Sequence, residues 1–279
     1  MQQKSYQGLS PLGFHNIAYT EWGNASSPQT LLCVHGLTRN GRDFDWLAED
    51  LQSEMRVICP DMVGRGKSDR LKDPALYSYA QYMSDITALI ARTGAESIDW
   101  VGTSMGGILG MYMAAQAKTP IRRLVINDVG PFIPLTSLKR IADYVGMPLE
   151  FADVDQLERH IRNIYAPFGI TEDADWKRLA ETSTYLLENG KRTLSHDIGI
   201  AKNFQSLKED VNFWQVYDQI KCPTLILRGS QSDVLSAETA KEMTQRGPRA
   251  KLIEFKNVGH APALINSEQI EIVRSFIAQ

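Results

Sequence analysis

Short apolar runs alternate along most of this chain with longer amphipathic stretches, and this alternation restricts its fold more than any other feature. An apolar run without polar interruption is typical of a strand in a parallel sheet that is covered on both faces. An amphipathic stretch with a spacing of three to four residues is typical of a covering helix. The 279 residues suffice for one large domain with an inserted subdomain. We therefore predict an α/β fold in which helices flank a mostly parallel central sheet.

The alternation also gives the expected elements. Apolar runs predict strands at Ile17–Trp22, Thr30–His35, Arg56–Pro60, Ser97–Thr103, Arg123–Asn127, Thr224–Arg228 and Lys251–Phe255. Amphipathic stretches predict helices at Phe44–Leu51, Tyr79–Arg92, Met105–Gln116, Ala237–Gln245 and Ser267–Ala278.

The alternation stops between the fifth and the sixth of these central runs. Residues 131–219 carry helical patterns at Leu135–Val145, Val154–Tyr165 and Asp173–Leu187 but no convincing buried strand. A structureless loop of that length is uncommon in a compact domain. We expect residues 131–219 to form a mainly helical cap, inserted in a core made of residues 1–130 and 220–279. Such lids commonly determine which substrate is accepted.

The segment 102–106, Gly-Thr-Ser-Met-Gly, has the pattern of a nucleophile elbow. It lies between an expected strand and an expected helix, which is the context that this pattern requires. Gly102 and Gly106 lack a Cβ and would relieve crowding around a tight turn. The turn would expose the Ser104 hydroxyl at a helix N-terminus, where developing negative charge is stabilised. Ser104 is therefore the candidate nucleophile.

A serine hydroxyl needs an adjacent base, which a third group orients. His260 follows the last expected strand and is the candidate base. Asp233 follows the strand before it and is the candidate acid, which gives the chain order Ser, Asp, His. Asp128 also ends an expected strand and is the alternative acid. We favour Asp233 because its position and its surrounding sequence fit better, with Asp128 read as a turn residue where the cap begins.

An oxyanion hole would complete this site. Residues 34–38, Val-His-Gly-Leu-Thr, follow an expected strand, so the Leu37 backbone N–H can point toward Ser104. The second donor would be the N–H of Met105, directly after the nucleophile. We interpret His35 as a structural residue of this loop that transfers no proton.

With these motifs in this order, the chain resembles the α/β-hydrolase superfamily, serine-nucleophile branch, over nearly its whole length. Residues 61–69, Asp-Met-Val-Gly-Arg-Gly-Lys-Ser-Asp, are similar to that family's DxxGxGxS turn, and the resemblance implies that they support the edge of the site without being catalytic. Asp61 and Asp69 are expected to cap loops there.

The resemblance implies a serine hydrolase, of the carboxylesterase, enol-lactonase or perhydrolase kind, that cleaves a small carboxylic ester or a related acyl compound through an acyl-enzyme. An enol-lactonase or a C–C bond hydrolase with the same triad is the alternative. A receptor on this fold that turns its ligand over slowly is a further alternative from another class. The serine at the elbow argues against relatives of this fold that use a carboxylate nucleophile.

Composition excludes several other classes. A formal net charge of -3 gives no electrostatic reason to expect nucleic acid or an anionic membrane as a partner. The polar start of the chain, without an apolar stretch behind it, predicts no signal peptide. Three widely spaced cysteines (Cys33, Cys59 and Cys222) are typical of reduced thiols in a cytoplasmic protein. We expect a small-molecule acyl substrate and neither a metal nor an organic cofactor; the sequence indicates no oligomeric state.

The cap carries residues that could contact a substrate. The aromatic candidates are Tyr165, Phe168, Trp176, Tyr185, Phe204, Phe213 and Trp214, which we interpret mainly as the core of the cap itself. Arg140, Arg162 and Arg192 could hold a substrate carboxylate, although solvated helix faces explain them better.

Overall fold

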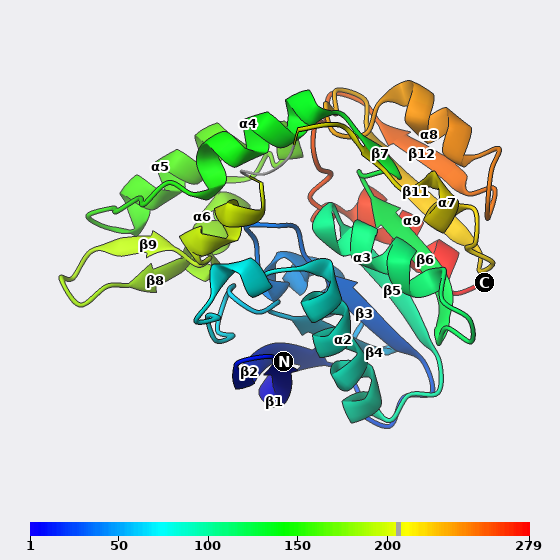
Figure 1. Ribbon diagram of the computed structural model, residues 1–279, viewed down its shortest axis with the longest axis horizontal. Helices are drawn as coiled ribbons and strands as arrows, with labels where there is room; N and C mark the ends of the chain where they lie inside the picture. The colour runs from blue at the N-terminus through cyan, green and yellow to red at the C-terminus, as the bar shows by residue number, and fades with distance from the viewer. Residues whose placement is uncertain (205–207) are drawn as a thin grey trace.

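An eight-stranded sheet runs through the centre of the molecule (Figure 1), in the strand order β1-β2-β4-β3-β5-β6-β11-β12. The structure is a computed structural model, and it describes residues 1–204 and 208–279. The antiparallel pairs β1–β2 and β2–β4 lie at one edge of the sheet, and the remaining neighbouring strands are parallel. The strands span β1 Gln2–Ser10, β2 Gly13–Trp22, β3 Thr30–Val34, β4 Arg56–Pro60, β5 Ile98–Thr103, β6 Ile121–Asn127, β11 Thr224–Gly229 and β12 Lys251–Phe255.

Helices cover both faces of this sheet, because successive strand residues point to opposite sides. One hydrophobic cluster joins the sheet to α2 (Tyr79–Thr93), α3 (Met105–Ala114) and α8 (Ala237–Met243). A second cluster joins the opposite face to α1 (Asp45–Leu51) and α9 (Ser267–Ile277). Neighbouring residues of β3 show the division, since Leu32 belongs to the first cluster and Leu31 to the second. The predicted α/β fold with a mostly parallel sheet is confirmed.

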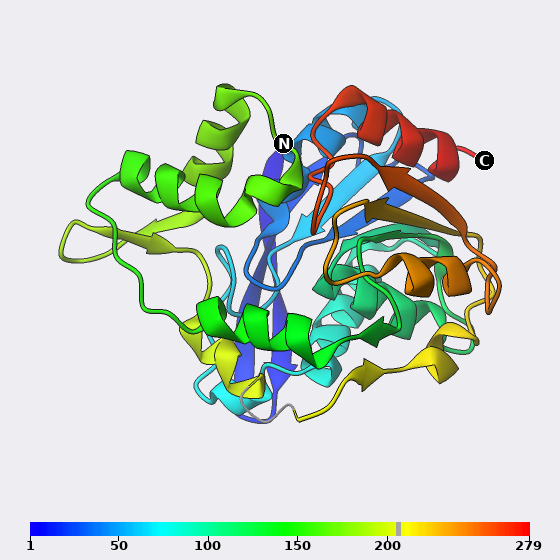
Figure 2. The same cartoon turned by 90° about the horizontal axis from the view of Figure 1, so that it is seen from above.

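The segment between β6 and β11 forms most of a lobe beside the sheet (Figure 2). Its helices are α4 Leu135–Val145, α5 Val154–Tyr165, α6 Asp173–Thr182 and the short α7 Trp214–Tyr217. Two small antiparallel pairs accompany them, β7 Phe132–Ile133 with β10 Val211–Asn212, and β8 Thr184–Leu186 with β9 Arg192–Leu194. Short 3-10 turns lie at Gly41–Phe44, Pro74–Leu76, Ala166–Phe168 and Ile198–Asn203. Helices α5 and α6 share a hydrophobic cluster of their own, which includes Leu157, Ile161 and Trp176.

One strand of the central sheet was missed, and one helix expected in the inserted segment is too long. The strand β1 was not predicted, because its polar residues alternate with few apolar ones and its outer side stays exposed. The helix expected at Asp173–Leu187 ends at Thr182, and the chain continues as β8, which pairs with β9. The other expected elements are present, with ends that differ by up to four residues.

No helix in the described part of the chain is both long and apolar enough to cross a membrane.

Candidate active site

Ser104 lies at the sharp turn between β5 and α3, with a backbone φ of 52° and ψ of -114°. A non-glycine residue adopts such a positive φ only where its surroundings hold it there. The two glycines around Ser104 make the turn possible, since a Cβ on Gly106 would overlap the Val34 carbonyl and one on Gly102 would overlap the Gly106 carbonyl. The expected nucleophile elbow is therefore present as a backbone conformation.

His260 lies between Ser104 and a carboxylate. Its Nε2 is 3.0 Å from Ser104 Oγ, and its Nδ1 is 2.8 Å from Asp128 Oδ2. Asp128 is fully buried and accepts a hydrogen bond from His260 Nδ1. The Nδ1–H tautomer of His260 therefore leaves its Nε2 free to accept the serine proton. The three side chains thus have the arrangement of nucleophile, base and orienting acid.

The choice of Asp233 as the acid is wrong for this structure. Its carboxylate is half exposed and pairs with Arg140, with 2.6 Å between Asp233 Oδ2 and Arg140 Nε. Asp128 follows β6, the neighbour of the strand β5 that precedes Ser104, and a φ of 59° turns its backbone sharply there. The Gly229 N–H donates to Asp128 Oδ1 at 2.9 Å, which leaves Oδ2 for His260. The alternative acid of the sequence analysis therefore lies where an acid is needed.

The loop after β3 passes beside Ser104. A Cβ on Gly36 would lie 3.7 Å from Ser104 Cβ, so Leu37 follows directly after a close approach of the loop to the serine. Among the described residues, neither the Leu37 N–H nor the Met105 N–H has a hydrogen-bond acceptor. Both donors are therefore available near the serine, where the oxyanion hole was expected.

The side chain of His35 holds this loop in place through two hydrogen bonds. Its Nδ1 donates to the Gly36 carbonyl at 2.6 Å, and its Nε2 accepts from the Met62 N–H at 2.9 Å. Burial lowers the pKa of His35 to about 3, so the ring is neutral with one donor and one acceptor. This geometry agrees with the structural role that we expected for His35.

Arg65 is a buried cation behind the same loop that sequence reasoning missed. Its Nε donates to the Leu37 carbonyl at 2.8 Å, and its Nη2 lies 3.6 Å from Met105 Sδ. Its Nη1 donates to Val63 and Tyr82, and no carboxylate lies within ion-pair distance among the residues that the structure describes. The sequence feature that could have indicated Arg65 is its position between the two glycines of the 61–69 turn. Arg65 thus holds a full positive charge beside both residues of the expected oxyanion hole.

Asp61 and Asp69 have the loop-capping contacts that we expected. Asp61 accepts from the backbone N–H groups of Gly41 and Lys67, both at 2.8 Å. Burial raises its pKa to about 6. Asp69 accepts from the Asn16 N–H at 2.7 Å.

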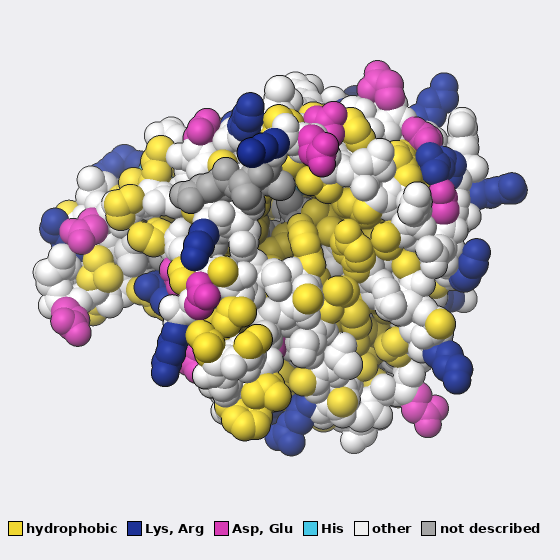
Figure 3. Space-filling view, in the orientation of Figure 1, with side chains coloured by type: hydrophobic (Ala, Val, Ile, Leu, Met, Phe, Trp, Pro, Cys, Tyr) yellow, Lys and Arg dark blue, Asp and Glu magenta, His cyan; other side chains and the backbone are white. Residues whose placement is uncertain are grey.

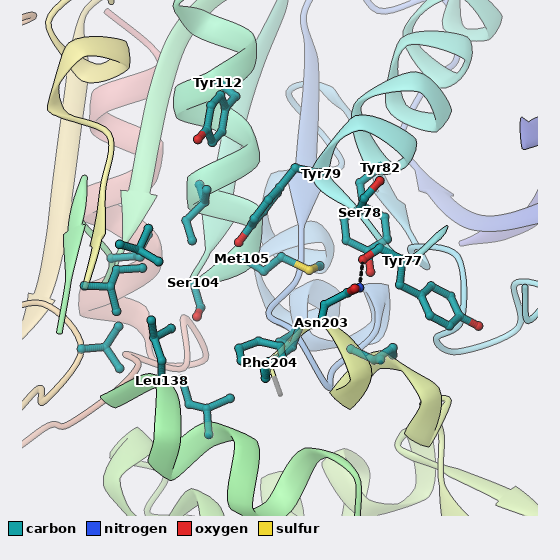
Figure 4. A pocket seen from close by; sticks show the side chains of 18 of the residues that line it. Tyr77, Ser78, Tyr79, Tyr82, Ser104, Met105, Tyr112, Leu138, Asn203 and Phe204 are labelled. Carbon is teal, nitrogen blue, oxygen red and sulfur yellow. Dashed lines mark hydrogen bonds between the residues drawn. The ribbon is translucent and has the colours of Figure 1, made fainter. Parts of the chain in front are cut away.

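A cavity of about 320 Å³ opens from Ser104 (Figure 4), between α3, α4 and the segment before α2. Its lining is almost wholly apolar or aromatic, with Tyr79, Tyr82 and Tyr112 among the rings. Hydrophobic side chains also gather in a hollow on the face shown in Figure 3. Sequence reasoning gave the tyrosines of α2 only as one face of an amphipathic helix, so their place in the cavity was missed.

Some of the aromatic candidates in residues 131–219 line a pocket at the site, and others belong to the core of that segment. Phe204 and Phe213 line this large cavity, and Tyr165 and Phe168 line a smaller pocket of about 80 Å³ that Ser104 also lines. Trp176 belongs to the cluster inside the lobe. Of the candidate arginines, Arg140 lines the smaller pocket, whereas Arg162 pairs with Glu158 and Asp173.

Among residues 1–204 and 208–279, no three His, Cys, Asp or Glu side chains are grouped so that they could hold a metal ion.

Comparison with known proteins agrees with this fold. A family model described as "alpha/beta hydrolase fold" matches residues 29–267. The chain is 40% identical to a 3-hydroxybutyrate-oligomer hydrolase of Cupriavidus necator, over 97% of this chain and 95% of that protein. It is 26% identical to a 2-(acetamidomethylene)succinate hydrolase of Mesorhizobium japonicum, over 88% and 87% of the two chains. The crystal structure of an alpha/beta hydrolase from Novosphingobium aromaticivorans superposes with a TM-score of 0.88 at 35% identity, covering 99% of this chain and 98% of that one.

Proposed function

Because this chain belongs to the alpha/beta hydrolase fold family and is a hydrolase of that family, we propose that it is a serine hydrolase of small carboxylic esters. The observation that carries the proposal is the position of His260, which contacts both Ser104 Oγ and the buried Asp128 carboxylate. A serine, a base and an orienting acid in this order are what nucleophilic acyl transfer requires.

The proposed reaction begins with attack of Ser104 Oγ on the ester carbonyl carbon. His260 Nε2 accepts the serine proton, and Asp128 stabilises the imidazolium that forms. The Leu37 and Met105 N–H groups donate to the oxyanion, and such a donor contributes on the order of 3 kcal/mol in related chemistry.

Collapse of the tetrahedral intermediate breaks the bond to the alcohol oxygen, which takes the proton from His260. A water molecule then attacks the acyl-enzyme with His260 as the base, and the acid and free Ser104 are released.

The relative from Cupriavidus necator suggests the substrate class. Its name gives 3-hydroxybutyrate oligomers as substrates, in which a hydroxy acid is both the acyl part and the alcohol part of each ester bond. We propose short oligoesters of this kind for the present chain.

The test is steady-state hydrolysis of the linear 3-hydroxybutyrate dimer and of p-nitrophenyl butyrate by the wild type and by Ser104→Ala. We expect the variant to lose activity by roughly 10⁴-fold or more while its thermal unfolding is unchanged. Hydrolysis at the wild-type rate by Ser104→Ala would refute the serine mechanism. Rapid hydrolysis of p-nitrophenyl butyrate but not of the dimer would refute the oligoester substrate alone.

A further inference from the structure

Two cavities of different size and chemistry meet at Ser104. The larger has a volume of about 320 Å³ and the smaller about 80 Å³. Both are lined by Ser104, Leu37 and Ile141, so the nucleophile and one expected oxyanion donor face each of them. A substrate at Ser104 therefore has two separate spaces for its two halves.

The walls of the two cavities differ in charge. The described lining of the larger cavity contains no charged side chain. It extends along α3, where Ser104, Ile108 and Tyr112 follow one another at intervals of four residues, a length of about 12 Å. The smaller pocket contains Arg39, Asp43, Arg140 and His260.

His260 decides which half of an ester occupies which space. Its ring lines the smaller pocket and is absent from the lining of the larger cavity. The imidazolium must protonate the leaving oxygen, so that oxygen must come within hydrogen-bond distance of Nε2. This requirement places the alcohol half of the ester in the smaller pocket and leaves the apolar cavity along α3 for the acyl half.

Arg140 gives the smaller pocket its chemical preference. Two of its nitrogens, Nε and Nη2, bond Asp233 at 2.6 and 3.0 Å, so one edge of the guanidinium is used. Within the part of the chain that the structure describes, the remaining N–H groups have no acceptor and can bind a second carboxylate. The other guanidinium of the pocket is less suitable, because Arg39 is buried, makes three hydrogen bonds to Asp43 and stacks on Tyr165.

We infer that the site divides its ester between these two spaces, with an apolar acyl chain along α3 and a short hydroxy acid as the alcohol, whose carboxylate binds Arg140. The inference rests on the proposed serine mechanism. It names a specificity residue on α4, in the lobe, and gives Asp233 a role as the carboxylate that competes with the substrate for Arg140.

The charge preference can be measured with one pair of substrates. The acid 3-(butyryloxy)butyrate and its primary amide share one ester bond and differ only in the charge of the alcohol half. We expect the wild type to prefer the acid, and Arg140→Gln to lower the acid-to-amide ratio of kcat/KM by roughly tenfold. Asp233→Asn should raise that ratio, because it removes the carboxylate that competes for Arg140.

Lys139→Gln is the matched control. Lys139 precedes Arg140 on the same helix, is exposed and lines neither cavity, so its loss removes the same charge without a contact to the substrate. We expect it to leave the ratio unchanged. If Arg140 and Asp233 only join the lobe to the core, Arg140→Gln and Asp233→Asn will change both substrates alike and leave the ratio constant, which would overturn the inference.

The size preference is measured with two ester series. Methyl esters of acids from acetate to decanoate lengthen the acyl half, and acetates of alcohols from methanol to octanol lengthen the alcohol half. We expect the wild type to accept long acyl chains and to reject long alcohols, and Ile108→Phe to shorten the accepted acyl chain. Acceptance of long alcohols together with rejection of long acids would reverse the assignment.

A fluorophosphonate adduct separates this inference from the proposed function. An adduct on Ser104 with turnover of both substrates, but with an unchanged ratio in Arg140→Gln, would reject the division of the ester alone. The absence of both adduct and turnover would reject the serine mechanism itself.

Discussion

Nδ1 of His260 donates a hydrogen bond of 2.8 Å to Asp128, a residue 132 positions earlier in the chain. The same imidazole faces Ser104 at 3.0 Å, whereas the Asp233 carboxylate pairs with Arg140 at the surface. This relationship decides which carboxylate can support the base.

Replacing each carboxylate by its amide tests that assignment. Asp128→Asn removes the acceptor that holds the imidazole tautomer, so we expect kcat to fall on the order of 10³- to 10⁴-fold. Asp233→Asn leaves the contacts of His260 intact and should lower kcat for a neutral ester far less. The measurement is kcat for p-nitrophenyl butyrate in both variants, with circular dichroism as the control for folding. The opposite ranking would return the acid role to Asp233.

The acid could not be decided from the sequence, because Asp128 and Asp233 both follow parallel strands and so reach the same edge of the sheet. The two aspartates differ in the backbone turn that follows each strand. Asp128 follows β6 directly with a φ of 59°, whereas Asp233 lies four residues beyond the end of β11. Neither feature is visible in residue types.

The central strands could be predicted because burial on both faces makes them continuously apolar. The bounds of β4 (Arg56–Pro60) and β12 (Lys251–Phe255) are as predicted. The edge strand β1 could not be predicted in this way, since most of its exposed residues are polar and only its pairing with β2 makes it a strand. The cavity along α3 also depends on packing between distant segments, so the residues that line it had no signal of their own.

Arg65 provides a second prediction, about the oxyanion hole. Arg65→Met removes the bond to the Leu37 carbonyl and the buried positive charge, so we expect kcat to fall by about 10²- to 10³-fold, comparable to the loss of an oxyanion donor. Arg65→Lys keeps the charge but not the forked geometry and should recover part of that loss.

Arg70→Met is the control for Arg65, since Arg70 lies a few residues further on, is exposed and stacks on Tyr185 away from the serine. Thermal unfolding of each variant separates folding from catalysis. An unchanged kcat in a folded Arg65→Met protein would show that Arg65 does not support the oxyanion hole.

We expect stability toward acid to depend in part on His196. Burial lowers the pKa of His196 to about 4 from its ordinary value of 6.5, and its Nε2 bonds the Val145 carbonyl at 3.1 Å. Between about pH 6.5 and 4 the unfolded chain binds a proton at this residue that the folded chain excludes, so stability falls as the pH falls. We expect His196→Gln, measured by urea unfolding, to reduce this pH slope by up to about 1.4 kcal/mol per pH unit. An identical slope in the two proteins would show that His196 does not titrate on unfolding.

That residues 131–219 form a cap remains a prediction, which the cluster between α5 and α6 makes testable. Leu157 is fully buried in that cluster, so Leu157→Ala should destabilise it by about 2–5 kcal/mol. We expect faster amide hydrogen exchange in residues 151–194, with β3 and β5 as well protected as in the wild type. Equal acceleration throughout the sheet would show that the lobe and the core unfold as one unit.

The most direct measurement is mass spectrometry of the protein after treatment with a fluorophosphonate, followed by peptide mapping of the adduct. Reaction requires a serine that a neighbouring base activates. The account predicts one adduct per chain, on Ser104, that forms rapidly in the wild type and much more slowly in Asp128→Asn. An adduct on another residue, or none, would contradict the assignment of Ser104, His260 and Asp128 as the catalytic centre.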